Sequence, residues 1–207
     1  MSNVLVENME LVAGKGRVGF QVKNEDGSTG MFSHFGTIKG TAKWCKVLEP
    51  DQYDNYAVDI YSDITHITEE ANDIIERAKE LVIASGKVVN GVADFTKVDN
   101  EGVEYVQFKR KGTKSDGTTN TPPKIYTASG IHDTNWSALI GNGSTVGVAY
   151  MLSPYYMAST KLVGVSCRFY ALQVIDLKEF KAGGGSSPFG NESGETPPFD
   201  TSDNDEF

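Results

Sequence analysis

Residues 36–61 read GTIKGTAKWCKVLEPDQYDNYAVDIY, and this stretch decides the fold that the sequence predicts. Its first half is predicted to be a strand that ends before a turn at Pro50 and Asp51. Its second half, from Tyr56 to Tyr61, alternates and is rich in β-forming residues, so it is predicted to be a second strand. The turn between them is short, and the two strands are therefore expected to pair antiparallel.

Lysines of the first strand stand next to an aromatic side chain. Regular alternation sorts its residues onto two faces, Lys39, Thr41, Lys43 and Cys45 on one and Ala42, Trp44 and Lys46 on the other. Lysine beside an aromatic ring on a sheet surface can bind a phosphate while the ring stacks on a base. The alternative is that Trp44 belongs to the core and that the lysines are ordinary exposed residues.

The flanking segments predict a hairpin on one side and a helix on the other. Residues 17–23 are expected to be a strand followed by a turn at 24–27, so residues 1–35 form an N-terminal hairpin extension. Thr68 is expected to cap a helix that ends at Gly86, because apolar residues recur there at three- and four-residue steps. The outer face of this helix is acidic and should lie away from any polyanion.

A cationic segment follows the next predicted strand, residues 102–112. In that strand Val103, Tyr105 and Gln107 alternate with Glu104, Val106 and Phe108. Around the loop that follows, five basic residues face one acid, Asp116; they are Lys109, Arg110, Lys111, Lys114 and Lys124. We expect this loop to clamp a flexible anion, and the alternative is a solvated turn.

The last third of the folded chain is expected to hold two strands, residues 140–152 and 162–177, and a long connection between them, residues 153–161. Aromatic residues are frequent here and shortly before, beside Lys161 and Arg168, and Arg168 is a candidate DNA contact. The candidates for base stacking are Tyr61, Tyr126, Tyr150, Tyr155 and Tyr156. Some of these rings must be core residues, and the pattern does not say which.

Charge is unevenly distributed along the chain, which has a net charge of −9. Residues 1–48 and 105–182 are net basic, and residues 49–104 are strongly acidic. Residues 183–207 carry six carboxylates and no Lys or Arg, so they are predicted to be a disordered tail. Such a tail can compete for a cationic groove and bind a partner through Asp200, Asp203, Asp205, Glu206 and Phe207. The alternative is a solubilising tail.

Several functional classes find no support in the sequence. His34, His66 and His132 lack ligand spacing, and phosphate-loop and nucleophile-elbow patterns are missing, so neither a metal, a cofactor nor an enzyme is expected. Without an apolar run near 18 residues or a signal sequence, we expect a cytosolic protein that does not enter membranes. Cys45 and Cys167 are expected to be buried thiols.

The order of these segments resembles tailed-phage single-stranded-DNA-binding proteins. The likeness rests on residues 36–61, on IGNGSTV at 140–146, KLVGV at 161–165 and LQVIDL at 172–177, and on the terminal DNDEF, so it covers roughly residues 36–177 and the tail. It implies an OB-type β barrel. Together with the patterns above, it predicts a mainly β domain with one inserted helix over residues 1–182, of which 1–35 are the hairpin extension, and a tail over 183–207. It also implies a protein of the host-cell cytoplasm during infection, which coats single-stranded DNA without sequence preference in replication and recombination and contacts partners such as DNA polymerase through its tail.

Two other functions stay open. The first is that of a non-enzymatic protein-interaction or virion component whose acidic tail binds a partner, with the basic loop merely solvated. The second is that of an annealing or recombination factor that acts on the same DNA. Whether it forms a homodimer is also open.

Overall fold

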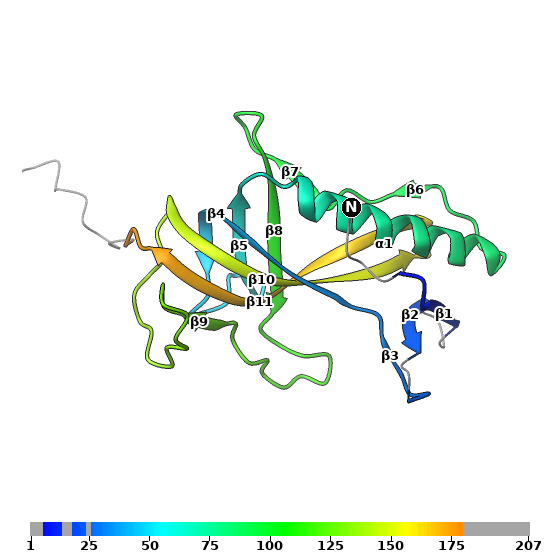
Figure 1. The fold of residues 1–207 in the computed structure, drawn as a ribbon, viewed down its shortest axis with the longest axis horizontal. Helices are drawn as coiled ribbons and strands as arrows, with labels where there is room; N and C mark the ends of the chain where they lie inside the picture. The colour runs from blue at the N-terminus through cyan, green and yellow to red at the C-terminus, as the bar shows by residue number, and fades with distance from the viewer. Residues whose placement is uncertain (1–5, 14–17, 24–25, 180–207) are drawn as a thin grey trace, which may run out of the picture.

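Five strands of the larger sheet close into a barrel (Figure 1). The computed structural model describes residues 6–13, 18–23 and 26–179, so the tail residues named above lie outside the described part. The barrel strands, in spatial order, are β4 (His34–Lys46), β5 (Asn55–Tyr61), β8 (Glu104–Lys111), β11 (Leu162–Asp176) and β10 (Ser144–Met157). β10 pairs back onto β4, and the β8–β11 contact is parallel. The predicted mainly β, OB-type barrel is confirmed.

Alternation along the barrel strands builds the core. Val58 and Ile60 of β5 and Val106 and Phe108 of β8 are fully buried, as the sequence pattern predicts. Their partners on the facing strands are Val146, Val148 and Leu152 of β10 and Phe169, Leu172 and Val174 of β11. The residues between these positions point away from the core, so the pattern that fills the barrel also defines its outer wall.

The last two strands form one long hairpin, and the predicted long connection is wrong. β10 and β11 pair continuously from Thr145 with Asp176 to Met157 with Leu162, so only residues 158–161 separate them. Lys161 closes this turn with a φ of 59°. Pro154 did not end the strand because it sits where β10 has left β4 and pairs only with β11.

Helix α1 (Thr65–Ala84) lies across one end of the barrel, over β10 and β11 (Figure 1). It begins three residues before the predicted cap. The Asp63 carboxylate accepts hydrogen bonds from the backbone N–H and the hydroxyl of Thr65, at 3.0 and 2.7 Å, and so takes the capping role assigned to Thr68. Thr68 instead donates its hydroxyl to the carbonyl of Ile64 within the first turn.

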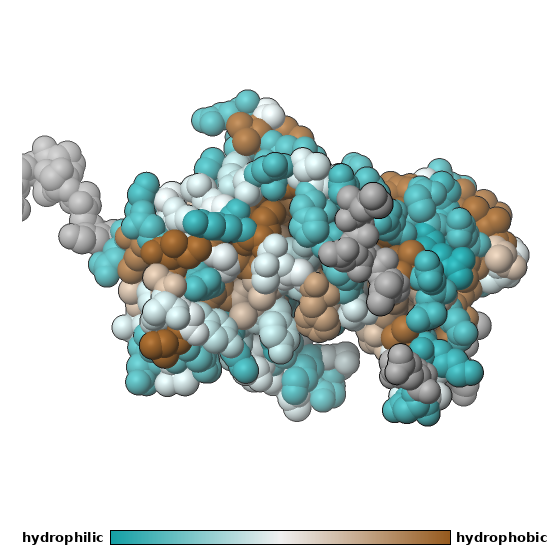
Figure 2. Space-filling model, in the orientation of Figure 1, coloured by the Kyte–Doolittle hydropathy of each residue, from teal (hydrophilic) through white to brown (hydrophobic). Residues whose placement is uncertain are grey.

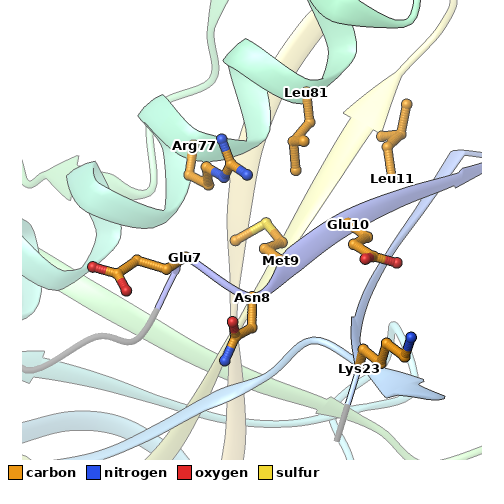
Figure 3. A pocket seen from close by; sticks show the side chains of 8 residues that line it. All are labelled: Glu7, Asn8, Met9, Glu10, Leu11, Lys23, Arg77 and Leu81. Carbon is orange, nitrogen blue, oxygen red and sulfur yellow. The ribbon is translucent and has the colours of Figure 1, made fainter. Parts of the chain in front are cut away.

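The N-terminal segment forms a small separate sheet of β1 (Met9–Ala13), β2 (Val18–Lys23) and β3 (Thr29–Met31). β2 and β3 are the predicted hairpin, and β1 adds a third strand. Figure 3 shows Met9 of β1 below Arg77 and Leu81 of α1, and Leu11 of β1 beside Leu81, around a hollow of about 640 Å³. This sheet is thus attached to the helix. Short strands complete the fold: β6 (Gly91–Val92), β7 (Thr96–Val98) and β9 (Lys124–Tyr126).

A buried carboxylate joins the helix to the barrel. Glu70 is 3% exposed, and its Oε2 accepts a 2.6 Å hydrogen bond from the Tyr150 hydroxyl of β10. Its Oε1 lies 3.1 Å from His34 Nε2 and 3.0 Å from His66 Nε2. His34 Nε2 makes no well-oriented hydrogen bond, so its contact with Glu70 is electrostatic and strongest when the ring is protonated. Three residues from three elements, Tyr150, His34 and His66, therefore contact this one side chain.

Both cysteines pack against the core, as expected. Burial raises the pKa of the Cys45 thiol and of the Cys167 thiol to about 12, so neither is a reactive thiolate at neutral pH. Within the described residues, α1 is not apolar enough to span a bilayer, and no other helix there is long enough.

Candidate nucleic-acid interface

A bulge in β4 turns its basic side chains to one face. Trp44 has a φ of 53°, and the pairing with β5 shifts by one residue between Lys43 and Lys46. Without this extra residue the two lysines would point to opposite faces, as regular alternation predicts. With it, Lys43 pairs with Asp59 and Lys46 with Ala57, and both lysines lie on the outer wall. Cys45, predicted to share a face with Lys43, packs inward instead.

The bulge is held by a residue far along the chain. The backbone N–H of Trp44 donates a 2.8 Å hydrogen bond to the Asn142 side chain, which precedes β10. The N–H of Gly143 donates to the carbonyl of Ala42, at 2.9 Å. A non-glycine residue in the left-handed region costs of order 1–3 kcal/mol and persists only where its surroundings enforce it. These two bonds supply that constraint.

Three cations line up across neighbouring strands of the outer wall. Lys46 of β4 pairs with Ala57 of β5, Ala57 with Lys109 of β8, and Lys109 with Arg168 of β11. Paired residues of a sheet project to the same side, so these side chains form one row about 14 Å long at roughly 4.8 Å per strand. Ala57 is the small residue in its middle. We call Lys46, Lys109 and Arg168 the cation row.

Two stacked tyrosines lie on the same wall, four residues along β5 and β8 from the row. The rings of Tyr61 and Tyr105 stack with their centroids 5.0 Å apart and an angle of 15° between their planes. Lys43 Nζ lies 4.0 Å from the centroid of the Tyr61 ring and 3.5 Å from Asp99 Oδ2. Burial and the neighbouring Asp99 carboxylate raise the pKa of Tyr61 to about 12, so its ring is neutral at neutral pH. The arrangement combines flat aromatic surface with a nearby cation.

Two carboxylates on the same wall are already engaged. Asp59 accepts a 2.7 Å hydrogen bond from the Gln107 amide, whose oxygen accepts another from Lys97 Nζ, and burial raises the pKa of Asp59. Hydrogen bonds from the backbone N–H groups of Val103 and Glu101 lower the pKa of Asp99. Asp99 is therefore an anion that holds Lys43.

Trp44 itself stands at the edge of the wall and is 68% exposed. The interpretation of Trp44 as a core residue is therefore wrong. Beside it lies a groove of about 510 Å³, bounded by residues 44–49 and 139–142. Lys46 lines this groove and also belongs to the cation row, so the groove continues the basic wall.

The structure gathers about half of the predicted site residues on this wall. On it lie Lys39, Lys43, Lys46, Tyr61, Lys109, Lys111 and Arg168, with Trp44 at the edge. They come from strands far apart in sequence, and only the barrel closure brings Arg168 next to Lys109.

The basic residues of the predicted clamp do not lie together in the structure. Arg110 lies on the opposite side of β8 from Lys109, because neighbouring strand residues alternate, and it donates a 3.0 Å hydrogen bond to the Asn120 side chain. Lys111 donates to the carbonyl of Tyr53. Lys114 lies in the turn closed by its own N–H with the carbonyl of Thr118, outside the strand ladder. Lys124 lies on β9, paired with Ala171 of β11.

Three of the predicted stacking tyrosines have structural roles. Tyr150 is fully buried with its hydroxyl on Glu70, so it cannot stack on a base. Tyr155 packs over Gly164, where an added Cβ would collide with its ring, and burial raises its pKa. Tyr156 donates to the carbonyl of Val88 and so ties the segment after the helix to β10. Tyr126 is half-buried on β9, with its ring 5.3 Å from the His132 ring.

Sequence reasoning missed Tyr105, which was assigned no role. Its alternation with Gln107 and Lys109 on one face of the strand could have indicated it, since those three residues share the outer wall.

The surface of the molecule is mixed in hydropathy. On the face drawn in Figure 2, brown hydrophobic patches are separated by teal hydrophilic residues and white residues of intermediate hydropathy. Among the described residues, no group of three or more His, Cys, Asp or Glu side chains could hold a metal ion.

The barrel order β4–β5–β8–β11–β10, with α1 between β5 and β8 and a parallel closure, defines an OB-type fold. The same fold occurs in gp2.5, a single-stranded-DNA-binding protein encoded by bacteriophage T7, with a TM-score of 0.60 and 18% identity, over 80% of this chain and 100% of that one. The single-stranded-DNA-binding protein of bacteriophage Enc34 aligns with a TM-score of 0.41 and 14% identity, over 84% and 94% of the two chains. No family model and no curated protein sequence matches the chain.

Proposed function

We propose that the protein binds single-stranded DNA on the outer wall of β4, β5, β8 and β11, without sequence preference. The observation that carries this proposal is the cation row beside the stacked Tyr61–Tyr105 pair. A single strand offers a phosphate backbone and unpaired base faces, which are the two features that a row of cations beside flat rings can bind. The shared fold with T7 gp2.5 supports the proposal as an analogy.

The mechanism follows from the geometry of the wall. Phosphates contact Lys46, Lys109 and Arg168, and these contacts carry no base information because every nucleotide has the same phosphate. Bases stack on the exposed rings at the edge of the row. Lys43 exchanges the Asp99 carboxylate for a phosphate when the strand arrives. The protein thereby coats DNA during replication and recombination rather than catalysing a reaction.

Titration of Trp44→Ala against the unaltered protein tests the proposal. Stacking on a base contributes about 1–3 kcal/mol, so the variant should bind a single-stranded oligonucleotide about 5- to 150-fold more weakly. Its melting temperature should hardly change, because the indole is exposed. Affinity is measured at one low salt concentration for homopolymers and for duplex of equal length.

Trp136→Ala is the matched control. Trp136 is partly buried and donates its indole N–H to the carbonyl of Ala138, so its removal should lower stability and leave affinity alone below the melting temperature. Equal affinity of the unaltered protein for duplex and single strands, or no affinity for either, would contradict the proposed function.

We further propose that the acidic tail, residues 183–207, competes with DNA for the cationic wall and recruits replication partners such as DNA polymerase. Its six carboxylates complement the cation row in charge. A flexible segment of 25 residues spans about 25–30 Å, and a short tether holds its ligand at an effective concentration of order mM.

Deleting residues 183–207 should therefore raise affinity for single-stranded DNA several-fold at low salt. The gain should shrink as salt rises, since ions screen tail and DNA alike. Affinity at a series of salt concentrations and pull-down of a polymerase are measured with both proteins. A tail that serves only solubility would leave both readings unchanged.

A further inference from the structure

A second aromatic pair lies on the barrel wall beyond the cation row. Phe35 of β4 is 59% exposed and Tyr170 of β11 is 49% exposed. Their rings meet edge to face, with centroids 5.8 Å apart and an angle of 84° between the planes. Aromatic side chains of this size are usually buried, so an exposed pair on a flat sheet surface indicates a binding surface.

Irregular pairing explains why Tyr170 projects outward. The register of β10 with β11 shifts between Ala149 and Tyr150, so that Ala149 pairs with Ala171, and Tyr150 with Phe169. Tyr170 is the extra residue, and its neighbour Phe169 fills the core. Ala149 of β10 pairs with Thr37 of β4 and Ala171 of β11, next to the strand positions of Phe35 and Tyr170.

Strand register connects this pair to the cation row. Arg168 pairs with Met151 of β10, and Met151 with Phe35 of β4. The ladder that starts at Lys46 thus winds once around the barrel and returns to the same strand at Phe35. Five strand spacings of about 4.8 Å make this path roughly 24 Å long. Arg168 is the exposed cation at its middle, and Tyr170 stands two residues further along β11.

A hollow of about 380 Å³ lies next to the pair. The small residues Gly147, Ala149 and Ala171 are among those that line it. Tyr126 and Lys39 line its sides, and Lys39 also lies on the outer face of β4. The hollow thus offers a ring and a cation beside small residues.

We propose that Phe35 and Tyr170 form a second stacking subsite, which takes unpaired bases of the same DNA strand after it has crossed Arg168. This inference rests on the proposed function and extends it: the bound strand winds around the barrel instead of crossing one face. The alternative occupant is a second copy of the chain. Arg168 and Lys39 favour a polyanion, and two rings offer far less than the roughly 800 Å² per partner of a stable protein interface.

Oligonucleotide length separates the two subsites. OB folds bind about 4–16 nucleotides, so homopolymers of about 4 and about 16 nucleotides are titrated against the full chain and the double variant Phe35→Ala/Tyr170→Ala. The short strand should bind both proteins equally, because the cation row alone holds it. The long strand should bind the double variant about tenfold or more weakly.

Met31→Ala is the control, because Met31 is apolar, 70% exposed and located on the N-terminal sheet. The single variants Phe35→Ala and Tyr170→Ala are measured as well, so that the test holds if the double variant is unstable. Unchanged affinity for the long strand would overturn the subsite, and so would an equal loss for both lengths. A change of sedimentation mass at unchanged DNA affinity would assign the pair to a protein interface. If the unaltered protein binds neither strand, the proposed function fails and this inference with it.

Discussion

Replacing Lys46, Lys109 and Arg168 together by alanine is expected to weaken binding of single-stranded DNA by about two orders of magnitude at low salt. Each exposed cation is assigned about 1 kcal/mol, which is low for a hydrogen bond to a charged group, and 1.4 kcal/mol corresponds to a factor of ten. The loss should be the same for all sequences, because phosphate contacts carry no base information. The slope of log affinity against log salt should fall by about 2, at 0.7 for each phosphate on a single strand.

Two further triple variants serve as controls for this result. Lys23, Lys79 and Lys87 lie on β2, α1 and the segment after α1, so their replacement changes net charge equally and should leave the salt slope unaltered. The sequence triplet Lys109, Arg110 and Lys111 should lose less affinity than the cation row, because Arg110 is bound to Asn120 off the wall. If the triplet variant loses more affinity than the cation-row variant, the DNA strand follows the loop after β8 instead of the cation row.

Glu70→Ala is expected to have the largest effect on stability, lowering the free energy of unfolding by about 3 kcal/mol. Removing one partner from a buried charged network costs about 3–5 kcal/mol, and here the Tyr150 hydroxyl and the buried His34 Nε2 would lose their shared carboxylate. At about 2–4 °C for each kcal/mol in a domain of 150–250 residues, the melting temperature should fall by roughly 6–12 °C. Thermal unfolding followed by circular dichroism measures the change.

Glu70→Gln and Asp73→Ala are the comparison variants for this prediction. The amide of Gln keeps an acceptor for Tyr150 but loses the charge, so its cost should lie between those of the other two variants. Asp73 is an exposed acid one turn further along α1, and its removal should cost less than about 0.5 kcal/mol. DNA affinity below the melting temperature should be the same in all three variants, because Glu70 is buried between α1 and the barrel and is not part of the outer wall. Equal melting temperatures of Glu70→Ala and Asp73→Ala would show that the network contributes nothing.

The class of fold could be predicted from local patterns. Alternation in residues 56–61 and 104–108 identified strands and their buried faces, and three- and four-residue spacing identified the helix, because these periods follow from backbone geometry. The boundaries were less accurate. Asp63 took over the cap of α1, and Pro154 lies within a strand, because pairing and capping partners decide where an element starts and ends.

The candidate site was predictable only in part. Its residue types, lysines beside aromatic rings, were visible in residues 36–61, and Tyr61, Lys109 and Arg168 were among the predicted contacts. The face that these residues share could not be predicted, since regular alternation placed Lys43 and Lys46 on opposite sides of the strand.

The tertiary structure decided which side chains share a surface. The bulge at Trp44 depends on Asn142, 98 residues away, and it alone turns Lys46 toward Lys43. The shift beside Tyr150 turns Tyr170 outward and leaves Tyr150 in the core, where Glu70 of the helix receives its hydroxyl. The pairing of Arg168 with Lys109 requires closure of the barrel. A period of two residues is a property of one strand, whereas a bulge and a closing register arise from contacts between strands, which a pattern along the chain does not contain.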